Sequence, residues 1–426
     1  MNKVILLFLA HCTTVLFACA GNPSSNGDND PIDGVAITLP KGFSAKVVAE
    51  KLGRARHIAV NSNGDIYVKL ERLRDGKGIL RLRDTNGDGA MDDVFAFGDY
   101  PGTGIAISNG YLYASSNSVV YRYKLNAKLD VENPDQPEVI VKDLVDKRQH
   151  ASKSIVLDGK GFIYVNIGAP SNACQEQDRT AGSAGQMPCP ILETAGGIWQ
   201  FKADRLNQTY AEGIRYATGL RNVVGLDWNH EMQELFVTQH GRDQLNQLHP
   251  NQYNVEQNAE LPAEEFLMAK KGMDAGWPYC YYDPFQKKKV LSPEYGGDGK
   301  QEGLCGSKEQ PLYAFPAHWA PNALMFYTGN QFGKKYAGGA FIAFHGSWNR
   351  APMKQGGYNV VFLPMKNGKP AGEYEIFADN FAGGEEFLTP AKAKHRPCGL
   401  SMGADGSMYI SDDQAGTIWK VTYTGK

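Results

Sequence analysis

One β-rich unit recurs six times along the chain, and this repeat limits the possible folds more than any other feature. Each copy is an apolar strand, a polar turn and a second apolar strand. In three copies the turn holds Asn63-Gly64, Asn109-Gly110 or Asp405-Gly406, dipeptides typical of tight hairpins. The copies lie at residues 57–68, 104–113, 154–165, 222–237, 323–344 and 399–410.

Further strands follow the copies, for example at residues 78–82 and 417–421, and helical periodicity is almost absent. Four strands in each of six copies predict an all-β fold, a six-bladed β-propeller, in which radial repetition leaves few exposed strand edges. The copies are about 50 residues apart early in the chain and farther apart later, which predicts insertions in blades three to five. Residues 43–49 are expected to complete the last blade. A pair of β-sandwiches is the alternative fold.

Composition places the chain among globular proteins. It has 426 residues, of which 42% are hydrophobic, and this is enough to build a sizeable core. The formal net charge of −2 argues against nucleic acid as a partner.

The first residues predict export rather than fold. A short positive start and an apolar centre indicate a signal peptide at residues 1–18, and Leu16-Phe17-Ala18-Cys19 resembles a bacterial lipobox with Cys19 as the lipidated residue. An ordinary cleaved signal is the alternative. Residues 19–36 resemble a flexible tether, which leaves 37–426 as the catalytic propeller. The expected location is the periplasm, with contact to the outer membrane only through the lipid.

Five cysteines follow Cys19, and export makes disulfides plausible. The pairs that are local in sequence are Cys174 with Cys189 and Cys280 with Cys305. Cys398 is left over and is expected to be a buried free thiol.

Large polar and charged side chains gather where predicted strands begin or end. The segment 344–350 (Phe-His-Gly-Ser-Trp-Asn-Arg) follows an apolar strand, although a simple turn needs none of these side chains. In a propeller, the loops of one face converge on the central channel. The positions expected to meet there are His57, His150, Arg221, Asn222, His318, Asn322 and Arg396.

Arg221, Arg350 and Arg396 are expected to face this channel from three blades. A guanidinium binds a carboxylate through two parallel hydrogen bonds and stays charged, so three of them would suit a ligand with several carboxylates. Ion pairs at the surface or between blades are the alternative. His150 precedes an inner strand and is a candidate general base, and nearby cations would favour its neutral form.

Two segments are calcium candidates. The Gly in 239–243 lets backbone carbonyls point inward, and such oxygens suit calcium, although an ordinary turn is the alternative. Residues 84–93 begin like an EF-hand loop but have Phe95 at the twelfth position, so they predict either a structural calcium site or a plain polar turn. The candidate ligands of that loop are Asp84, Asn86, Asp88 and Asp92. The segment 276–279 (Gly-Trp-Pro-Tyr) is interpreted either as the wall of a sugar site or as packing around a disulfide.

From residue 39 to 421 the chain resembles the soluble quinoprotein sugar dehydrogenases, closest to the L-sorbosone dehydrogenase branch and related to soluble glucose dehydrogenase and fungal pyranose dehydrogenase. The motifs that carry the resemblance are His150 and segments 219–222, 239–243, 276–278, 344–350, 396–399 and 411–416. The resemblance implies a six-bladed propeller that binds pyrroloquinoline quinone (PQQ), a planar tricarboxylic acid, together with calcium.

The resemblance also implies roles for single residues. His150 would remove the proton of the sugar C1 hydroxyl while hydride passes to PQQ, and Arg221 and Asn222 would contact the quinone. Arg350 and Arg396 would bind its carboxylates, with His318 also in the cofactor site. Gly241 and Arg242 would hold calcium through their carbonyls. The substrate would be an aldose or aldehyde sugar such as sorbosone, and a quinone or cytochrome would accept the electrons.

The sequence departs from soluble glucose dehydrogenase in two places. There, an acidic residue at the end of a strand supports the catalytic histidine, whereas 167–172 has no carboxylate. Either Asp243 or a backbone carbonyl would orient His150 instead. A PQQ-binding lysine is also replaced by 344–350, so Arg350 is its nearest equivalent and Lys354 the second.

Two other functions stay open. A calcium-dependent propeller hydrolase, such as a lactonase, would need a carboxylate-lined channel. A non-catalytic propeller that binds protein or polysaccharide would not need inward arginines.

Overall fold

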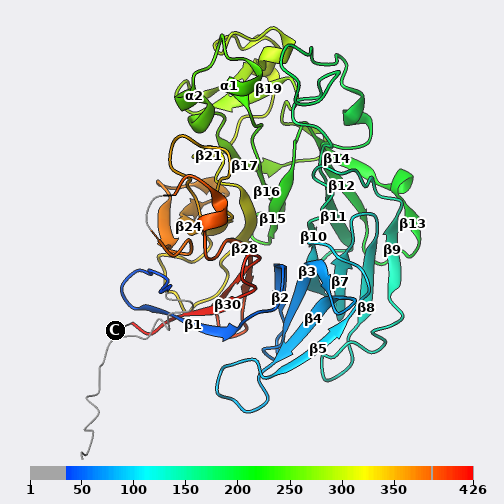
Figure 1. The fold of residues 1–426 in the computed structure, drawn as a ribbon. Helices are drawn as coiled ribbons and strands as arrows, with labels where there is room; N and C mark the ends of the chain where they lie inside the picture. Colours follow the sequence, from blue (N-terminus) through cyan, green and yellow to red (C-terminus); the bar gives the residue numbers. More distant parts are fainter. Residues whose placement is uncertain (1–34, 385–386, 426) are drawn as a thin grey trace, which may run out of the picture.

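A computed structural model describes residues 35–384 and 387–425, and it forms a six-bladed β-propeller (Figure 1). The predicted fold is confirmed. The first two blades are β2 (Ala55–Val60), β3 (Ile66–Arg74), β4 (Lys77–Arg83) and β5 (Asp93–Phe97), then β6 (Ile105–Ser108), β7 (Tyr111–Ser115), β8 (Val120–Lys124) and β9 (Glu138–Lys142). Blade three is β10 (Ile155–Leu157), β11 (Phe162–Ile167), β12 (Gly197–Lys202) and β14 (Ile214–Thr218).

The other three blades follow the same plan. They are β15 (Val223–Asn229), β16 (Glu234–Gln239), β17 (Glu264–Ala269) and β21 (Tyr313–Phe315), then β22 (Pro321–Phe326), β23 (Ala340–Phe344), β24 (Asn359–Leu363) and β27 (Glu375–Ala378), and last β28 (Pro397–Met402), β29 (Met408–Asp412), β30 (Ile418–Tyr423) and β1 (Phe43–Ala49). Strand β1 pairs antiparallel with β30, so the N-terminal strand closes the ring as expected.

The inner strands form a closed circle. Each of β2, β6, β10, β15, β22 and β28 contacts the next, and β28 returns to β2 (Figure 1). A separate apolar core fills each of the six interfaces between neighbouring blades. Because strand side chains alternate between the two faces of a sheet, each blade buries one set against each neighbour.

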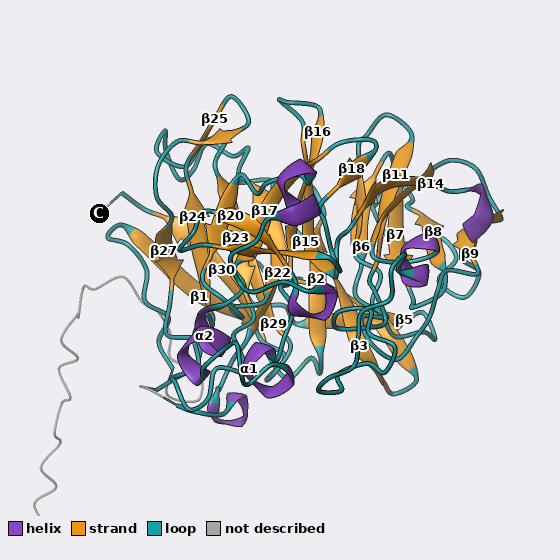
Figure 2. Ribbon diagram, turned by 90° about the horizontal axis from the view of Figure 1, so that it is seen from above, coloured by secondary structure: helices purple, strands orange, loops and turns teal. Residues whose placement is uncertain are grey.

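Insertions extend blades three to five, as the spacing of the copies predicts. They carry α1 (Leu245–Leu248), α2 (Val255–Glu260) and the hairpin of β19 (Cys280–Asp283) with β20 (Lys288–Leu291). Figure 2 shows α1 and α2 at one face of the ring and β25 (Met365–Lys366) at the other, where it pairs with β26 (Lys369–Pro370). Short strands β13 (Gln208–Thr209) and β18 (Met273–Asp274) add parallel to β9 and β14. Single 3₁₀ turns are η1 (Pro190–Glu193), η2 (Tyr210–Glu212), η3 (Pro293–Tyr295), η4 (Gly303–Ser307) and η5 (Pro390–Lys392).

The packed structure begins slightly earlier than predicted, because Val35 is already buried. The predicted signal peptide, Cys19 and the tether up to residue 34 lie outside the described residues. No helix in the described part of the chain is long and apolar enough to cross a membrane.

Candidate active site

A cavity of about 550 Å³ lies over the circle of inner strands, at the ends where β2, β15, β22 and β28 begin. Its lining is dominated by side chains with N–H groups. The cationic and imidazole residues in the lining are Arg56, Arg148, Arg179, Arg221 and Arg396 with His150, His240, His318 and His345, and the acidic ones are Asp243, Glu71 and Glu264. Asn222 and Asn322 also line it, as do Thr103 and Asn117 of blade two. Loops from all six blades therefore meet here, including the five that the sequence predicts.

His150 lies in this cavity in a left-handed backbone conformation, with φ of 51°. Its Nδ1 is 2.5 Å from the carbonyl oxygen of Ala169. Since a carbonyl oxygen only accepts, Nδ1 must carry the hydrogen, and Nε2 keeps a lone pair. Burial, with the charge of Arg221 as the next contribution, lowers the pKa of His150 to about 3. The imidazole is therefore neutral and has one free basic nitrogen. Of the two expected ways to orient His150, the backbone carbonyl is the one present.

Asp243 instead forms an ion pair with Arg221. The Oδ2 atom of Asp243 lies 2.7 Å from Nη2 of Arg221 and 3.0 Å from Nη2 of Arg179. Burial opposes ionisation of Asp243, but the charges of Arg221, His318 and Arg179 hold its pKa well below the usual range. This carboxylate therefore balances the positive charge of the lining.

Arg221 is buried, and protein acceptors take most of its donors. Nε donates to the Asn172 carbonyl, Nη1 to the Gly241 carbonyl, and Nη2 to Asn172 Oδ1 and Asp243. A guanidinium has five N–H groups, so one on Nη1 remains for a ligand. Arg396 is held by the carbonyls of His345 and Gly346 and keeps more donors available.

The expectation that three arginines converge is wrong for Arg350. Its guanidinium donates to the carbonyls of Ala259, Ala317 and Lys354 and pairs with Glu260, and it does not line the cavity. Lys354 is exposed and also lies outside the lining. Arg350 instead joins the loop after β23 to the end of α2, which is the ion-pair alternative considered for it.

Asn222 and His318 are brought to the cavity as predicted. Asn222 Oδ1 accepts a hydrogen bond of 3.3 Å from Asn166 Nδ2. His318 Nε2 donates to the carbonyl of Asn258 at 2.8 Å, and its Nδ1 accepts from Asn349 Nδ2 at 3.4 Å. His57 points elsewhere, since it does not line this cavity and its Nε2 lies 2.7 Å from the Asn322 carbonyl.

The lining also holds residues that the sequence reasoning missed. His345 Nε2 donates to Asp413 Oδ1 at 2.6 Å, and Arg56 Nη1 lies 2.8 Å from Asp413 Oδ2. Trp348, at the mouth, is half exposed. His345 and Trp348 lie inside the segment 344–350. The sequence signal for them was that a simple turn needs no such side chains. Arg56 comes from the start of β2, one residue before His57.

The predicted ligands of the active-site calcium are the backbone carbonyls of Gly241 and Arg242. The carbonyl of Gly241 accepts the Arg221 hydrogen bond of 2.9 Å, and the Arg242 side chain pairs with Glu294 outside the cavity. Glu264 accepts hydrogen bonds from the backbone N–H groups of Gly241 and Ala320, and burial raises its pKa to about 8. Over residues 35–384 and 387–425, no group of three or more His, Cys, Asp or Glu is arranged to hold a metal ion.

The loop with Asp84, Asn86, Asp88 and Asp92 uses its oxygens internally. Asp84 accepts from the N–H groups of Gly87 and Gly89, and Asp92 accepts from Thr85. These are the bonds of a polar turn, and a structural calcium there stays a prediction.

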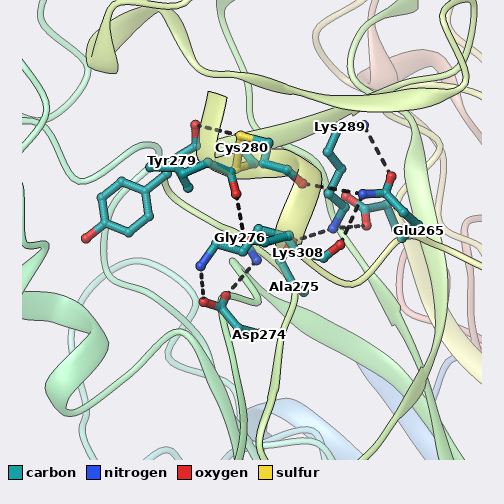
Figure 3. The surroundings of a disulfide bond; sticks show 12 residues. Glu265, Asp274, Ala275, Gly276, Tyr279, Cys280, Lys289 and Lys308 are labelled. Carbon is teal, nitrogen blue, oxygen red and sulfur yellow. Dashed lines mark hydrogen bonds and ion pairs between the residues drawn. A yellow bond between two sulfur atoms is a disulfide. The ribbon is translucent and has the colours of Figure 1, made fainter. Parts of the chain in front are cut away.

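The predicted disulfides, Cys174–Cys189 and Cys280–Cys305, are both present, and Cys398 is free and buried. Trp277 packs on the first disulfide and donates to the Asn172 carbonyl, so the packing interpretation of 276–279 holds. Figure 3 shows the second disulfide and Lys289 of the neighbouring strand beside Glu265. The Lys289 ammonium lies 2.8 Å from the Glu265 carboxylate, and both side chains are buried. The disulfides fix the inserted loops behind the cavity.

Comparisons with known proteins agree with this architecture. The TrAA12-like family profile matches residues 37–424. A "Pyrroloquinoline quinone-dependent sugar dehydrogenase" of Hypocrea jecorina is 21% identical, with 93% of each chain covered. An uncharacterized protein of Borreliella burgdorferi is 31% identical over 210 residues, which span 49% of this chain and 48% of that protein. The chain thus spans about half the length of that relative.

The fold is also that of solved structures. The holo form of the pyranose dehydrogenase PQQ domain from Coprinopsis cinerea superposes with a TM-score of 0.73 at 19% identity, covering 91% of this chain and 97% of that one. The calcium structure of a Trichoderma reesei carbohydrate-active enzyme of family AA12 gives 0.74 at 19% identity, covering 93% and 99%. The chain therefore belongs to the TrAA12-like family, among the soluble PQQ-dependent sugar dehydrogenases that its motifs resemble.

Proposed function

We propose that the protein is a PQQ-dependent dehydrogenase that oxidises an aldose or an aldehyde sugar, such as sorbosone, at C1. The observation that carries the proposal is the neutral His150 in a cavity lined by arginines. Its neutral imidazole with a free Nε2 suits a general base, and five guanidiniums suit a ligand with several carboxylates.

The lining is compatible with PQQ. The cavity of about 550 Å³ falls in the range of small-molecule sites. Arg396 and the exposed Arg148 have donors for carboxylates, and Arg221 offers its remaining Nη1 hydrogen to a quinone oxygen. When bound, PQQ supplies a quinone that accepts a hydride.

In the proposed reaction, His150 accepts the proton of the C1 hydroxyl at Nε2 while the C1 hydrogen leaves with two electrons. The Ala169 carbonyl holds the imidazole in the required tautomer. A cyclic aldose becomes a lactone in this way, whereas an aldehyde first adds water, and its hydrate then loses the C1 hydroxyl proton and the C1 hydrogen to become an acid. An external quinone or cytochrome takes up the two electrons, and His150 returns its proton to solvent.

Calcium remains a prediction from the family resemblance, and no step is derived through it. A cation at the Gly241 carbonyl would lie beside the Arg221 guanidinium, which donates to the same oxygen. We also propose export to the periplasm with a lipid on Cys19. The two disulfides favour an oxidising compartment.

The test is reconstitution of purified apoprotein with PQQ, with and without calcium. Calorimetry measures PQQ binding, and a dye-linked assay measures oxidation of aldoses and sorbosone. We expect saturable binding and sugar-dependent dye reduction, and loss of the latter in His150→Ala with PQQ binding retained. His230→Ala, on an exposed turn, is the control. Failure to bind PQQ would refute the proposal and favour a hydrolase or a binding propeller.

A further inference from the structure

A second cavity, of about 310 Å³, lies on the side of the ring between blades one and two. Its floor is one face of the outer strands of blade one. Asp93, Phe95 and Phe97 alternate along β5 and share that face, and cross-strand pairing places Arg81 beside Phe95 and Arg83 beside Asp93. Asp130 and Val131, from the turn after β8, form the opposite wall. None of these residues belongs to the active-site cavity.

An aromatic platform is open to solvent in this cavity. The Phe95 side chain is 43% exposed, although it lies on a strand, and it stacks on the buried Phe97 with ring centroids 5.8 Å apart. The guanidinium of Arg81 lies 5.8 Å from the centre of the Phe95 ring. Phe97 and Arg81 therefore hold the ring in place, while much of Phe95 stays accessible to solvent at this cavity.

Polar groups of both kinds border the platform. Arg81 pairs with Asp93 at 2.6 Å and with Asp130 at 3.4 Å, and Arg83 pairs with Asp130 at 2.7 Å. Arg81 is nine-tenths buried, yet its Nε has no hydrogen-bond partner. The carboxylates of Asp93 and Asp130 stay partly exposed, so they have acceptor positions to spare.

An aromatic ring bordered by both carboxylates and guanidiniums favours a neutral ligand with several hydroxyl groups. The carboxylates repel an anion and the guanidiniums repel a cation. A hydroxyl group both donates and accepts, so neighbouring sugar hydroxyls can donate to a carboxylate and accept from a guanidinium. The apolar face of a pyranose ring packs on an aromatic ring. We propose that this cavity, centred on Phe95, is a saccharide-binding site separate from the active site and independent of PQQ.

The test is calorimetry of the whole protein, without PQQ, against cellotriose, maltotriose and xylotriose. We expect at least one to bind with a Kd below about 5 mM. Phe95→Ala should weaken that binding at least tenfold, and Asp93→Asn should weaken it severalfold. Val94→Ala is the matched control, because Val94 is equally exposed but faces away from the cavity. It should bind as the wild type does.

Two results would overturn the proposal. One is that no trisaccharide binds in this range. The other is that Phe95→Ala binds like Val94→Ala, which would place any bound sugar elsewhere. Sugar oxidation by PQQ-loaded Phe95→Ala should equal that of the wild type on monosaccharides, so failure here is separable from failure of the proposed activity.

Discussion

The carboxylate of Asp243 lies 2.7 Å from the guanidinium of Arg221, and the nearby His150 is oriented by the carbonyl of Ala169. The buried carboxylate therefore stabilises a cation in the lining rather than the proposed base. His150 has no directly bound anion, and burial together with the charge of Arg221 lowers its pKa.

Removal of the Asp243 carboxylate should destabilise the fold. Asp243→Ala leaves Arg221 buried and unpaired, which costs about 3–5 kcal/mol of unfolding free energy. Urea denaturation measures this. Asp135→Ala is the control, since Asp135 is exposed and its loss should cost less than about 0.5 kcal/mol. Equal midpoints for the two variants would contradict the structural role.

The pH dependence of kcat/KM should lack a protonation step near pH 6.5. Because the pKa of His150 is lowered to about 3, the imidazole stays in its basic form as the pH falls below 6.5. We expect activity to persist to below pH 5 in an acid-tolerant buffer series. An acid limb centred near the ordinary pKa of histidine would show that His150 is solvated or is not the base.

Substitution of Arg396 should weaken PQQ binding, whereas substitution of Arg350 should lower the stability of the fold. Arg396→Met removes a guanidinium from the cavity and should weaken PQQ binding by tenfold or more, measured by calorimetry. Arg350→Met should change the PQQ Kd by less than about threefold but lower the unfolding free energy by about 2–4 kcal/mol, because Glu260 and two buried carbonyls lose their donor. The reverse pattern would place Arg350 in the cofactor site.

Buried neutral histidines should make the protein sensitive to acid. Burial lowers the pKa of His57 to about 4. The unfolded chain then binds more protons below pH 6.5, so the stability due to this group is present above pH 6.5 and is lost as the pH falls to 4. At pH 5 the loss is about 2 kcal/mol. His57→Gln cannot protonate, so its unfolding free energy should fall less between pH 6.5 and 5. Parallel pH profiles for wild type and variant would refute this.

The disulfide Cys280–Cys305 should hold the β19–β20 hairpin in place. Replacing both cysteines by alanine should lower the unfolding free energy by about 2–4 kcal/mol and expose the segment 276–308 to limited proteolysis. Mass spectrometry of the fragments identifies the cut. The buried Lys289–Glu265 pair links this hairpin to β17 of blade four, so Lys289→Met should expose the same segment. Cleavage elsewhere in the ring would contradict a local effect.

The sequence by itself determined the blades, because the information is local. Alternation along a strand and a turn such as Asn63-Gly64 fix a hairpin within a dozen residues, and six such units can bury their faces only against one another. The same local logic predicted the two disulfides and the closing strand at 43–49, all of which are confirmed. His150, Arg221, Asn222, His318 and Arg396 reached the cavity because strand starts share one face of the ring.

Only the tertiary structure decided what each side chain faces. Arg350 follows β23 and Arg396 precedes β28, so both lie at a strand end. Arg350 contacts α2, which belongs to an insertion of blade four, whereas Arg396 lines the cavity. Asp243 is 93 residues after His150 and 22 after Arg221, and no spacing rule tells which it will pair with. Such contacts join loops of different blades. Their distances depend on how the ring closes and how the insertions fold, and neither is encoded in a local pattern.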